Sequence, residues 1–175
     1  MSGNYTKSET DYRHVTKGRV IMKLYLVQHG EAYAKEVDPD RPLTDHGKAD
    51  VQRLAAFLQR ANIQVARLIH SGKLRAVQTA DILAGAIAPG IELEISGLIN
   101  PKDNPKAFDW QQGSWIKDTL IVGHLPFMAK LASHLLMGDD GRLITAFVPG
   151  SIVCLQHQND NHWQINWMIR PELLV

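Results

Sequence analysis

Short apolar runs recur along this chain at the length and period of β-strands. They predict six strands, at residues 22–28, 65–71, 91–95, 118–124, 151–157 and 162–169. The run at 91–95 alternates between apolar and polar residues, as an edge strand does. The last two strands flank the turn-forming sequence Gln-Asn-Asp-Asn, which predicts a terminal hairpin.

Three stretches between the strands carry apolar side chains at helical spacing. They predict helices within residues 43–61, 73–88 and 126–138. We expect Thr44 to be the N-cap of the first helix and Gly138 to close the third. Residues 97–117, with Pro, Asn, Gly and two tryptophans, predict a loop with a short helix around 105–112.

The order of these elements predicts the fold class. Strands interleaved with helices, followed by a hairpin, indicate an α/β fold with a mostly parallel sheet and helices on both faces, a three-layer sandwich. Residues 1–21 are mostly polar and predict an N-terminal extension, so we expect a single domain over residues 22–175.

Composition and charge exclude several classes of protein. A net charge of +1 gives no electrostatic reason to expect nucleic acid or an anionic membrane surface as a partner. No stretch approaches the roughly 20 consecutive apolar residues that cross a bilayer, and the first residues lack the apolar core of a signal peptide. The single cysteine, Cys154, lies in an apolar run and predicts a core residue in a reducing compartment. We expect a cytoplasmic protein.

Chemically useful side chains follow three of the predicted strands. Gln28 and His29 end the first strand, Ser71 ends the second with Arg75 in the next helix, and His124 ends the fourth. Ligands bind at the carboxyl ends of parallel strands, and helix N-termini there favour anions. These residues therefore predict a site for a phosphoryl group. The remaining histidines show no zinc-like grouping, so we expect no metal site.

Four spaced blocks resemble the histidine phosphatase superfamily, closest to the short bacterial protein-phosphohistidine phosphatases of the SixA type. The blocks are Gln-His-Gly-Glu-Ala (28–32), Arg-Pro-Leu-Thr-Asp-His-Gly (41–47), residues 70–80 and Ile-Val-Gly-His-Leu-Pro (121–126). The resemblance runs from about residue 22 to 170. It implies a phosphoglycerate-mutase-like fold and transfer of a phosphoryl group to a histidine, with no metal or cofactor.

The resemblance also implies roles for particular residues. His29 matches the nucleophile, Arg75 the arginine that holds phosphoryl oxygens, and His124 the second catalytic histidine. A neutral imidazole attacks phosphorus and later leaves, while cations and N–H donors, including that of Leu125, stabilise the equatorial oxygens. We expect Ser71 to bind phosphate or to cap its helix, and Glu31 to act as an acid or to orient His29. A phosphate or sulfate ion is expected in the site.

Gln28 is where this chain departs from the resemblance, because the superfamily has arginine before the nucleophile. Glutamine brings no charge and no bidentate fork. Losing one charge-assisted contact costs on the order of 1.5–3 kcal/mol. Three outcomes follow: Arg41 or Lys73 replaces the missing cation, the site takes a less charged or more labile substrate, or the site binds without turnover.

Residues 97–117 bear on the class of substrate. Phosphate monoesters need an acid for their leaving group, and this segment offers Asp103 and Asp109 as its acids. Phosphohistidine has a labile P–N bond and an easily protonated leaving group, so we expect a phosphohistidine-bearing protein as substrate. A small-molecule phosphomonoesterase and a phosphate- or phosphoprotein-binding module weakened by Gln28 remain alternatives. Trp110 or Trp115 is a candidate for the mouth of the site.

Overall fold

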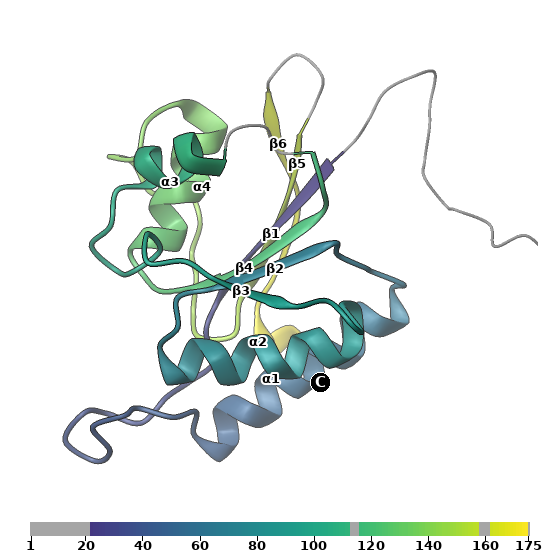
Figure 1. Cartoon of the computed structure of the whole chain (residues 1–175), viewed down its shortest axis with the longest axis vertical. Helices are drawn as coiled ribbons and strands as arrows, with labels where there is room; N and C mark the ends of the chain where they lie inside the picture. The colour runs from purple at the N-terminus through teal and green to yellow at the C-terminus, as the bar shows by residue number, and fades with distance from the viewer. Residues whose placement is uncertain (1–21, 113–115, 158–161, 175) are drawn as a thin grey trace, which may run out of the picture.

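A six-stranded sheet forms the centre of the molecule, in the order β3-β2-β4-β1-β5-β6 (Figure 1). The computed structural model describes residues 22–112, 116–157 and 162–174, without the side chains of 110–112. The strands span Met22–Gln28 (β1), Arg67–His70 (β2), Leu93–Ile95 (β3), Thr119–Gly123 (β4), Ile152–His157 (β5) and Trp163–Ile169 (β6). The proposed extension 1–21, the hairpin turn 158–161 and Trp115 lie outside the described residues, as does the Trp110 side chain.

The first four strands pair in parallel, and the last two join the sheet by antiparallel pairing. β4 pairs in parallel with both β1 and β2, and β3 pairs in parallel with β2 at the edge. β5 runs antiparallel to β1, and β6 runs antiparallel to β5. The edge position of β3 and the terminal hairpin confirm the sequence prediction.

Helices cover both faces of the sheet, which confirms the predicted three-layer α/β fold (Figure 1). The helices α1 (Asp45–Arg60) and α2 (Leu74–Ile87) pack on one face, and α3 (Pro105–Gln112) and α4 (Phe127–Met137) pack on the other. On β1, Tyr25 and Val27 point to the first pair of helices, and Leu24 and Leu26 point to the second. Burial on both faces explains why this strand is a continuous apolar run. Within the described residues, no helix is long and apolar enough to cross a membrane.

Two strands begin two residues later than the sequence predicts. β2 begins at Arg67 rather than 65, because the Val65 N–H donates to the Ile87 carbonyl and the Ala66 N–H to that of Asp118. β3 begins at Leu93 rather than 91, because the Ile91 N–H donates to the Ala88 carbonyl and so belongs to the turn after α2. At the start of each strand, backbone N–H groups that the apolar pattern assigns to the sheet therefore donate to carbonyls outside it.

A pair of glycines lets the chain after β1 run directly against α1. A Cβ atom at Gly47 would stand 2.2 Å from the Glu31 carbonyl oxygen, and one at Gly30 would stand 2.8 Å from Val51. Thr44 caps α1 as predicted, since its Oγ1 accepts from the Gly47 N–H at 2.9 Å. This close approach fixes the backbone immediately after His29.

Candidate active site

The carboxyl ends of β1 and β4 place two histidines side by side. The backbone N–H of His29 donates to the Gly123 carbonyl at 3.1 Å, which joins the two strand ends just beyond their last pair. The rings of His29 and His124 have centroids 4.9 Å apart at an angle of 57°. Residues 95 positions apart in the chain thus form one side-chain pair.

Two hydrogen bonds fix which nitrogen of His29 carries the proton. Its Nδ1 lies 2.7 Å from the Gly30 carbonyl oxygen, which only accepts, so Nδ1 must be protonated. The Nε–H of Arg75 points at Nε2 from 3.1 Å, and this guanidinium group only donates, so Nε2 must hold a lone pair. The ring is therefore a neutral imidazole with its free lone pair toward an arginine.

Burial and cations keep both rings neutral near pH 7. Burial is the main cause that lowers the pKa of His29 to about 4, and the charges of Arg75 and Arg41 lower it further. Burial also lowers the pKa of His124 to about 3, assisted by His29, Arg75, Lys73 and Arg41. The charged groups of the described chain that act on these rings are thus all cations. Two neutral imidazoles with cationic side chains nearby favour the binding of an anionic ligand.

Arg75 lies in the first turn of α2, where the loop after β1 holds it in place. Thr79 Oγ1 accepts from the Gly30 N–H at 3.1 Å and donates to the Arg75 carbonyl at 2.7 Å. Burial, followed by the charge of Arg41, lowers the pKa of the Arg75 guanidinium. Sequence reasoning missed Thr79, although its position four residues after Arg75 places it one helical turn further on the same face.

The imidazole of His124 has one hydrogen-bond partner among the described residues, Ser71. The Ser71 hydroxyl lies 2.6 Å from Nε2 of His124, across from the end of β2 to the end of β4. The Nδ1 atom of His124 is buried and has no partner among the described residues. Ser71 and His124 therefore act together as a polar pair beside His29.

Arg41 and Lys73 are the further cations beside the two histidines. The Arg41 Nε–H donates to the Tyr33 carbonyl at 3.0 Å, and its two Nη groups have no acceptor among the described residues. Arg41 has a φ of 53°, a left-handed conformation that is uncommon outside glycine. Lys73 precedes α2 as its N-cap residue without a side-chain cap bond. The charges of both side chains lower the pKa of His124.

Backbone hydrogen bonds hold Gln28 in position at the end of β1. Its N–H donates to the Ser151 carbonyl, and its own carbonyl accepts from the Gly150 N–H, each at 3.1 Å. The side chain is 8% exposed, and its Oε1 is buried without a hydrogen-bond partner in the described residues. In the alternation of β1, Gln28 follows Leu24 and Leu26 on the face that α4 covers.

Glu31 is hydrogen-bonded to the N-cap residue of α1, and Leu125 lies just before α4. The Glu31 carboxylate accepts from the Thr44 hydroxyl at 2.7 Å, and its backbone carbonyl accepts from the Thr44 N–H at 3.0 Å. Glu31 is thus engaged at the N-terminus of α1. Leu125 follows His124 directly, before a cis peptide bond to Pro126 and the start of α4.

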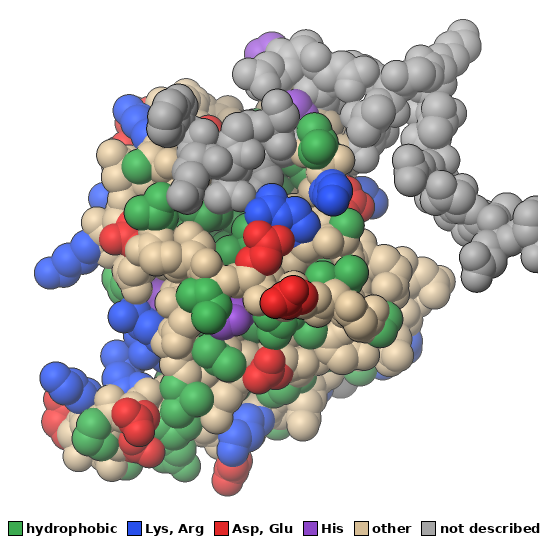
Figure 2. All heavy atoms as spheres, in the orientation of Figure 1, with side chains coloured by type: hydrophobic (Ala, Val, Ile, Leu, Met, Phe, Trp, Pro, Cys, Tyr) green, Lys and Arg blue, Asp and Glu red, His purple; other side chains and the backbone are tan. Residues whose placement is uncertain are grey.

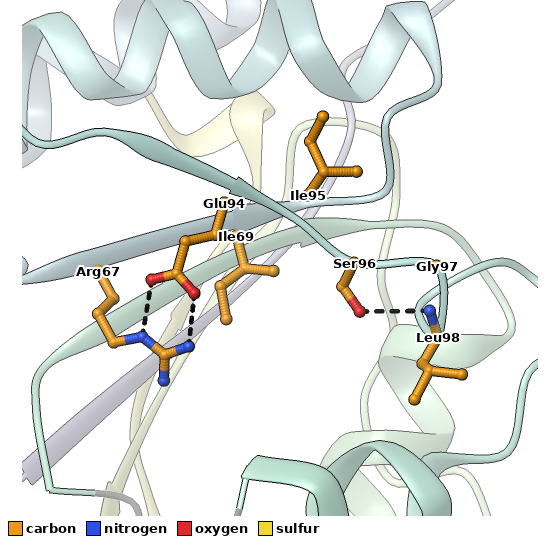
Figure 3. Close-up of a pocket in the computed structure, with 7 residues that line it drawn as sticks. All are labelled: Arg67, Ile69, Glu94, Ile95, Ser96, Gly97 and Leu98. Carbon is orange, nitrogen blue, oxygen red and sulfur yellow. Dashed lines mark hydrogen bonds and ion pairs between the residues drawn. The ribbon is translucent and has the colours of Figure 1, made fainter.

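The surface carries a hollow at the β3 edge of the sheet (Figure 3). It measures about 430 Å³ and is lined by Arg67, Ile69, Glu94, Ile95, Ser96, Gly97 and Leu98. Arg67 and Glu94 form a two-point ion pair across it, at 2.8 and 2.7 Å, so their charges cancel.

The described residues contain no group of three or more potential metal ligands. On the face in Figure 2, the blue Lys and Arg side chains at the lower left lie beside a purple histidine.

Comparison with known proteins places this geometry in a family. The profile of the histidine phosphatase superfamily (branch 1) matches residues 24–97, which contain His29, Ser71 and Arg75. An uncharacterized protein of Picosynechococcus is 33% identical over 130 residues, covering 69% of this chain and 76% of that protein. The phosphohistidine phosphatase SixA of Escherichia coli K12 is 23% identical over 155 residues, covering 86% of this chain and 94% of that protein.

The fold agrees with solved structures of the same group. The structure of the protein histidine phosphatase SixA complexed with tungstate superposes with a TM-score of 0.76 at 21% identity, covering 88% of this chain and all of that one. At this identity the likeness shows the fold. Together with the family profile and the sequence relatives, it establishes that this chain belongs to the histidine phosphatase superfamily and is SixA-like.

Proposed function

We propose that this protein hydrolyses phosphohistidine on a protein, by way of a phosphoryl group carried on His29. The single observation that supports this most is the lone pair on Nε2 of His29, fixed by the Gly30 carbonyl on one side and faced by Arg75 on the other. A ring in this tautomer attacks phosphorus with Nε2 as it is, without first losing a proton. The membership in a superfamily of phosphoryl-group hydrolases supports the same reaction.

The reaction divides into two displacements at phosphorus. In the first, Nε2 of His29 forms a bond to phosphorus, the P–N bond of the substrate breaks, and the leaving imidazole takes up a proton from solvent. In the second, water attacks phosphorus, the bond to Nε2 breaks, and phosphate leaves with the proton of the water going to solvent or phosphate. Arg75 and Arg41 stabilise the equatorial oxygens in both steps. Leu125, Gln28 and Ser71 are the proposed neutral donors to the phosphoryl group.

The positions of the carboxylates favour a phosphohistidine substrate over a phosphate monoester. Asp103 accepts from the Asn100 N–H at 2.6 Å, Asp109 pairs with His134 at 3.2 Å, and Glu31 is engaged by Thr44. Each of these three acids is thus bonded to a neighbour other than His29. An alkoxide leaving group needs such an acid, whereas an imidazole leaving group is readily protonated. The E. coli relative is named a phosphohistidine phosphatase, which supports the same class of substrate.

The test compares three phosphorylated substrates on the purified full chain. A phosphohistidine protein, a phosphoserine peptide and a sugar phosphate are supplied separately, and phosphate release is measured together with the acid-labile phosphoenzyme trapped by rapid quench. We expect at least tenfold higher kcat/KM on the phosphohistidine protein and no phosphoenzyme in His29→Asn. Gln52→Asn, at an exposed position in α1, is the matched control and should retain activity.

Two results would overturn the proposal. Faster turnover of the sugar phosphate would indicate a small-molecule phosphatase. Tight binding of tungstate without turnover of any substrate would indicate a binding module.

A further inference from the structure

One turn of α2 binds two separate loops of the site. Thr79, four residues after Arg75, accepts from the Gly30 N–H through its Oγ1 at 3.1 Å. Gln78, three residues after Arg75, accepts from the Leu43 N–H through its Oε1 at 2.7 Å. Residues three and four positions apart lie on one face of a helix. The face of α2 that carries Arg75 therefore also holds the loop after β1 and the loop that ends at Leu43.

The Leu43 N–H needs an acceptor from outside its own loop. Leu43 pairs with Ala32 in an isolated antiparallel bridge, and the flanking residues make the two backbone hydrogen bonds of this bridge, each at 3.0 Å. In such a pair, the N–H groups of the two paired residues point away from each other. Leu43 is buried, and a buried N–H without an acceptor is costly. Gln78 supplies the acceptor from α2.

Arg41, two residues before Leu43, needs contacts that hold it in place. Its φ of 53° is in the left-handed region, which a residue other than glycine keeps only where its surroundings hold it. Repulsion acts on the same residue, because the charge of Arg41 lowers the pKa of Arg75. Two guanidinium groups beside one anion site repel each other while the anion is absent. The bond between Leu43 and Gln78 opposes this repulsion, because it joins the loop of Arg41 to the helix of Arg75.

We propose that Gln78 is a positioning residue, which holds Arg41 at the distance from Arg75 at which both guanidinium groups bind one phosphoryl group. The amide oxygen of Gln78 is engaged by Leu43, so Gln78 acts on the anion through Arg41. The proposal rests on the proposed function for the role of Arg41, and its test is read on tungstate, without turnover. A purely structural Gln78 would stabilise the fold and would affect anion binding equally with and without Arg41.

The first test is a double-mutant cycle on tungstate affinity, measured by calorimetry on the full chain. Arg41→Met should weaken binding by about tenfold or more, because it removes a charge-assisted contact. Gln78→Met, which keeps the length of the side chain and removes the acceptor, should weaken binding by about fivefold. In the Arg41→Met background the same change should weaken binding by less than about twofold, because the group that Gln78 positions is gone. Gln59→Met, the same replacement at an exposed position in α1, is the matched control and should leave the affinity unchanged.

The second test reads the hydrogen bond itself, by amide hydrogen exchange. In Gln78→Met the Leu43 N–H should exchange about tenfold faster or more, because its acceptor is lost. The neighbouring Thr44 N–H, which donates to the Glu31 carbonyl at 3.0 Å, should change little. Gln78→Glu keeps an acceptor oxygen, so it should keep the Leu43 N–H protected.

Three results would overturn the proposal. Equal losses from Gln78→Met in both backgrounds would show that Gln78 does not act through Arg41. Unchanged affinity in either single variant would show that the removed group has no part in binding the anion. Equal acceleration of the Leu43 and Thr44 amides would show that Gln78 stabilises the loop as a whole. A wild-type protein that binds tungstate and turns over no substrate refutes the proposed function, and the cycle still decides the role of Gln78.

Discussion

The Nε–H of Arg75 lies 3.1 Å from Nε2 of His29, so the cation occupies the side from which the lone pair must act. A phosphoryl group entering the site takes over this donor, and Arg75 then binds its oxygens. We predict that Arg75→Met lowers kcat on a phosphohistidine substrate by about a thousandfold. The pKa of His29 should also rise from about 4, remaining below 6.5 because burial is its largest cause. Single-turnover kinetics and an NMR titration check the two effects. Arg60→Met, exposed in the last turn of α1, should change neither.

The buried histidines make stability depend on pH. The pKa of His29 is about 4 when folded and 6.5 in an unfolded chain, so the unfolded chain binds more protons between these values. The free energy of unfolding should therefore be highest above about pH 6.5 and fall as the pH falls toward 4. On this basis His29 accounts for a loss on the order of 3 kcal/mol. Burial lowers the pKa of His124 to about 3, which adds to the loss in the same direction.

Urea unfolding of the wild type and His29→Asn at several pH values checks this pH dependence. The variant should lose less stability between pH 7 and pH 4.5 than the wild type, and Gln52→Asn, at an exposed position in α1, should follow the wild type. Equal pH slopes in the wild type and His29→Asn would show that the His29 ring is not buried as a neutral group.

The sequence alone was sufficient to predict the fold class. Strands buried on both faces appear in it as continuous apolar runs, and helices appear as apolar residues at helical spacing. It also placed His29, Arg75 and His124 at one edge, since the ends of parallel strands meet there. It did not reveal the bond between Ser71 and His124, which depends on how two loops 53 residues apart are bent. Nor did it show that Thr44 holds Glu31, because the residue type fits an acid, an orienting group and a cap equally well.

The close approach of Gly47 to Glu31 predicts a large difference between two glycine substitutions. In Gly47→Ala the new Cβ would stand 2.2 Å from a backbone oxygen, so the loop after His29 must move. We expect a loss of stability of about 1–3 kcal/mol or more and reduced activity. Gly85→Ala, in α2 with nothing within 4 Å of the new Cβ, should instead stabilise the protein by about 0.5–1 kcal/mol. Thermal unfolding of both variants checks the contrast, and equal effects would contradict it.

Gln28 gives the sharpest test of how this site differs from its relatives. Its Oε1 is buried without a partner in the described chain, which costs stability unless a ligand supplies a donor. Gln28→Met keeps the shape and removes that oxygen, so it should raise the free energy of unfolding by about 1 kcal/mol without tightening tungstate binding. Gln28→Arg places a cation in a site that is 8% exposed, so it should lower stability in anion-free buffer.

Tungstate should reverse that loss in Gln28→Arg, because the anion pairs with the new charge and binds about tenfold or more tightly. Calorimetry and thermal unfolding with and without tungstate measure both quantities in the two variants. If Gln28→Arg binds tungstate more weakly than the wild type, the amide is itself a ligand and the site is tuned to a less charged phosphoryl group. If it binds more tightly and also turns over faster, glutamine attenuates the activity, because Arg41 and Lys73 do not fully replace the missing cation.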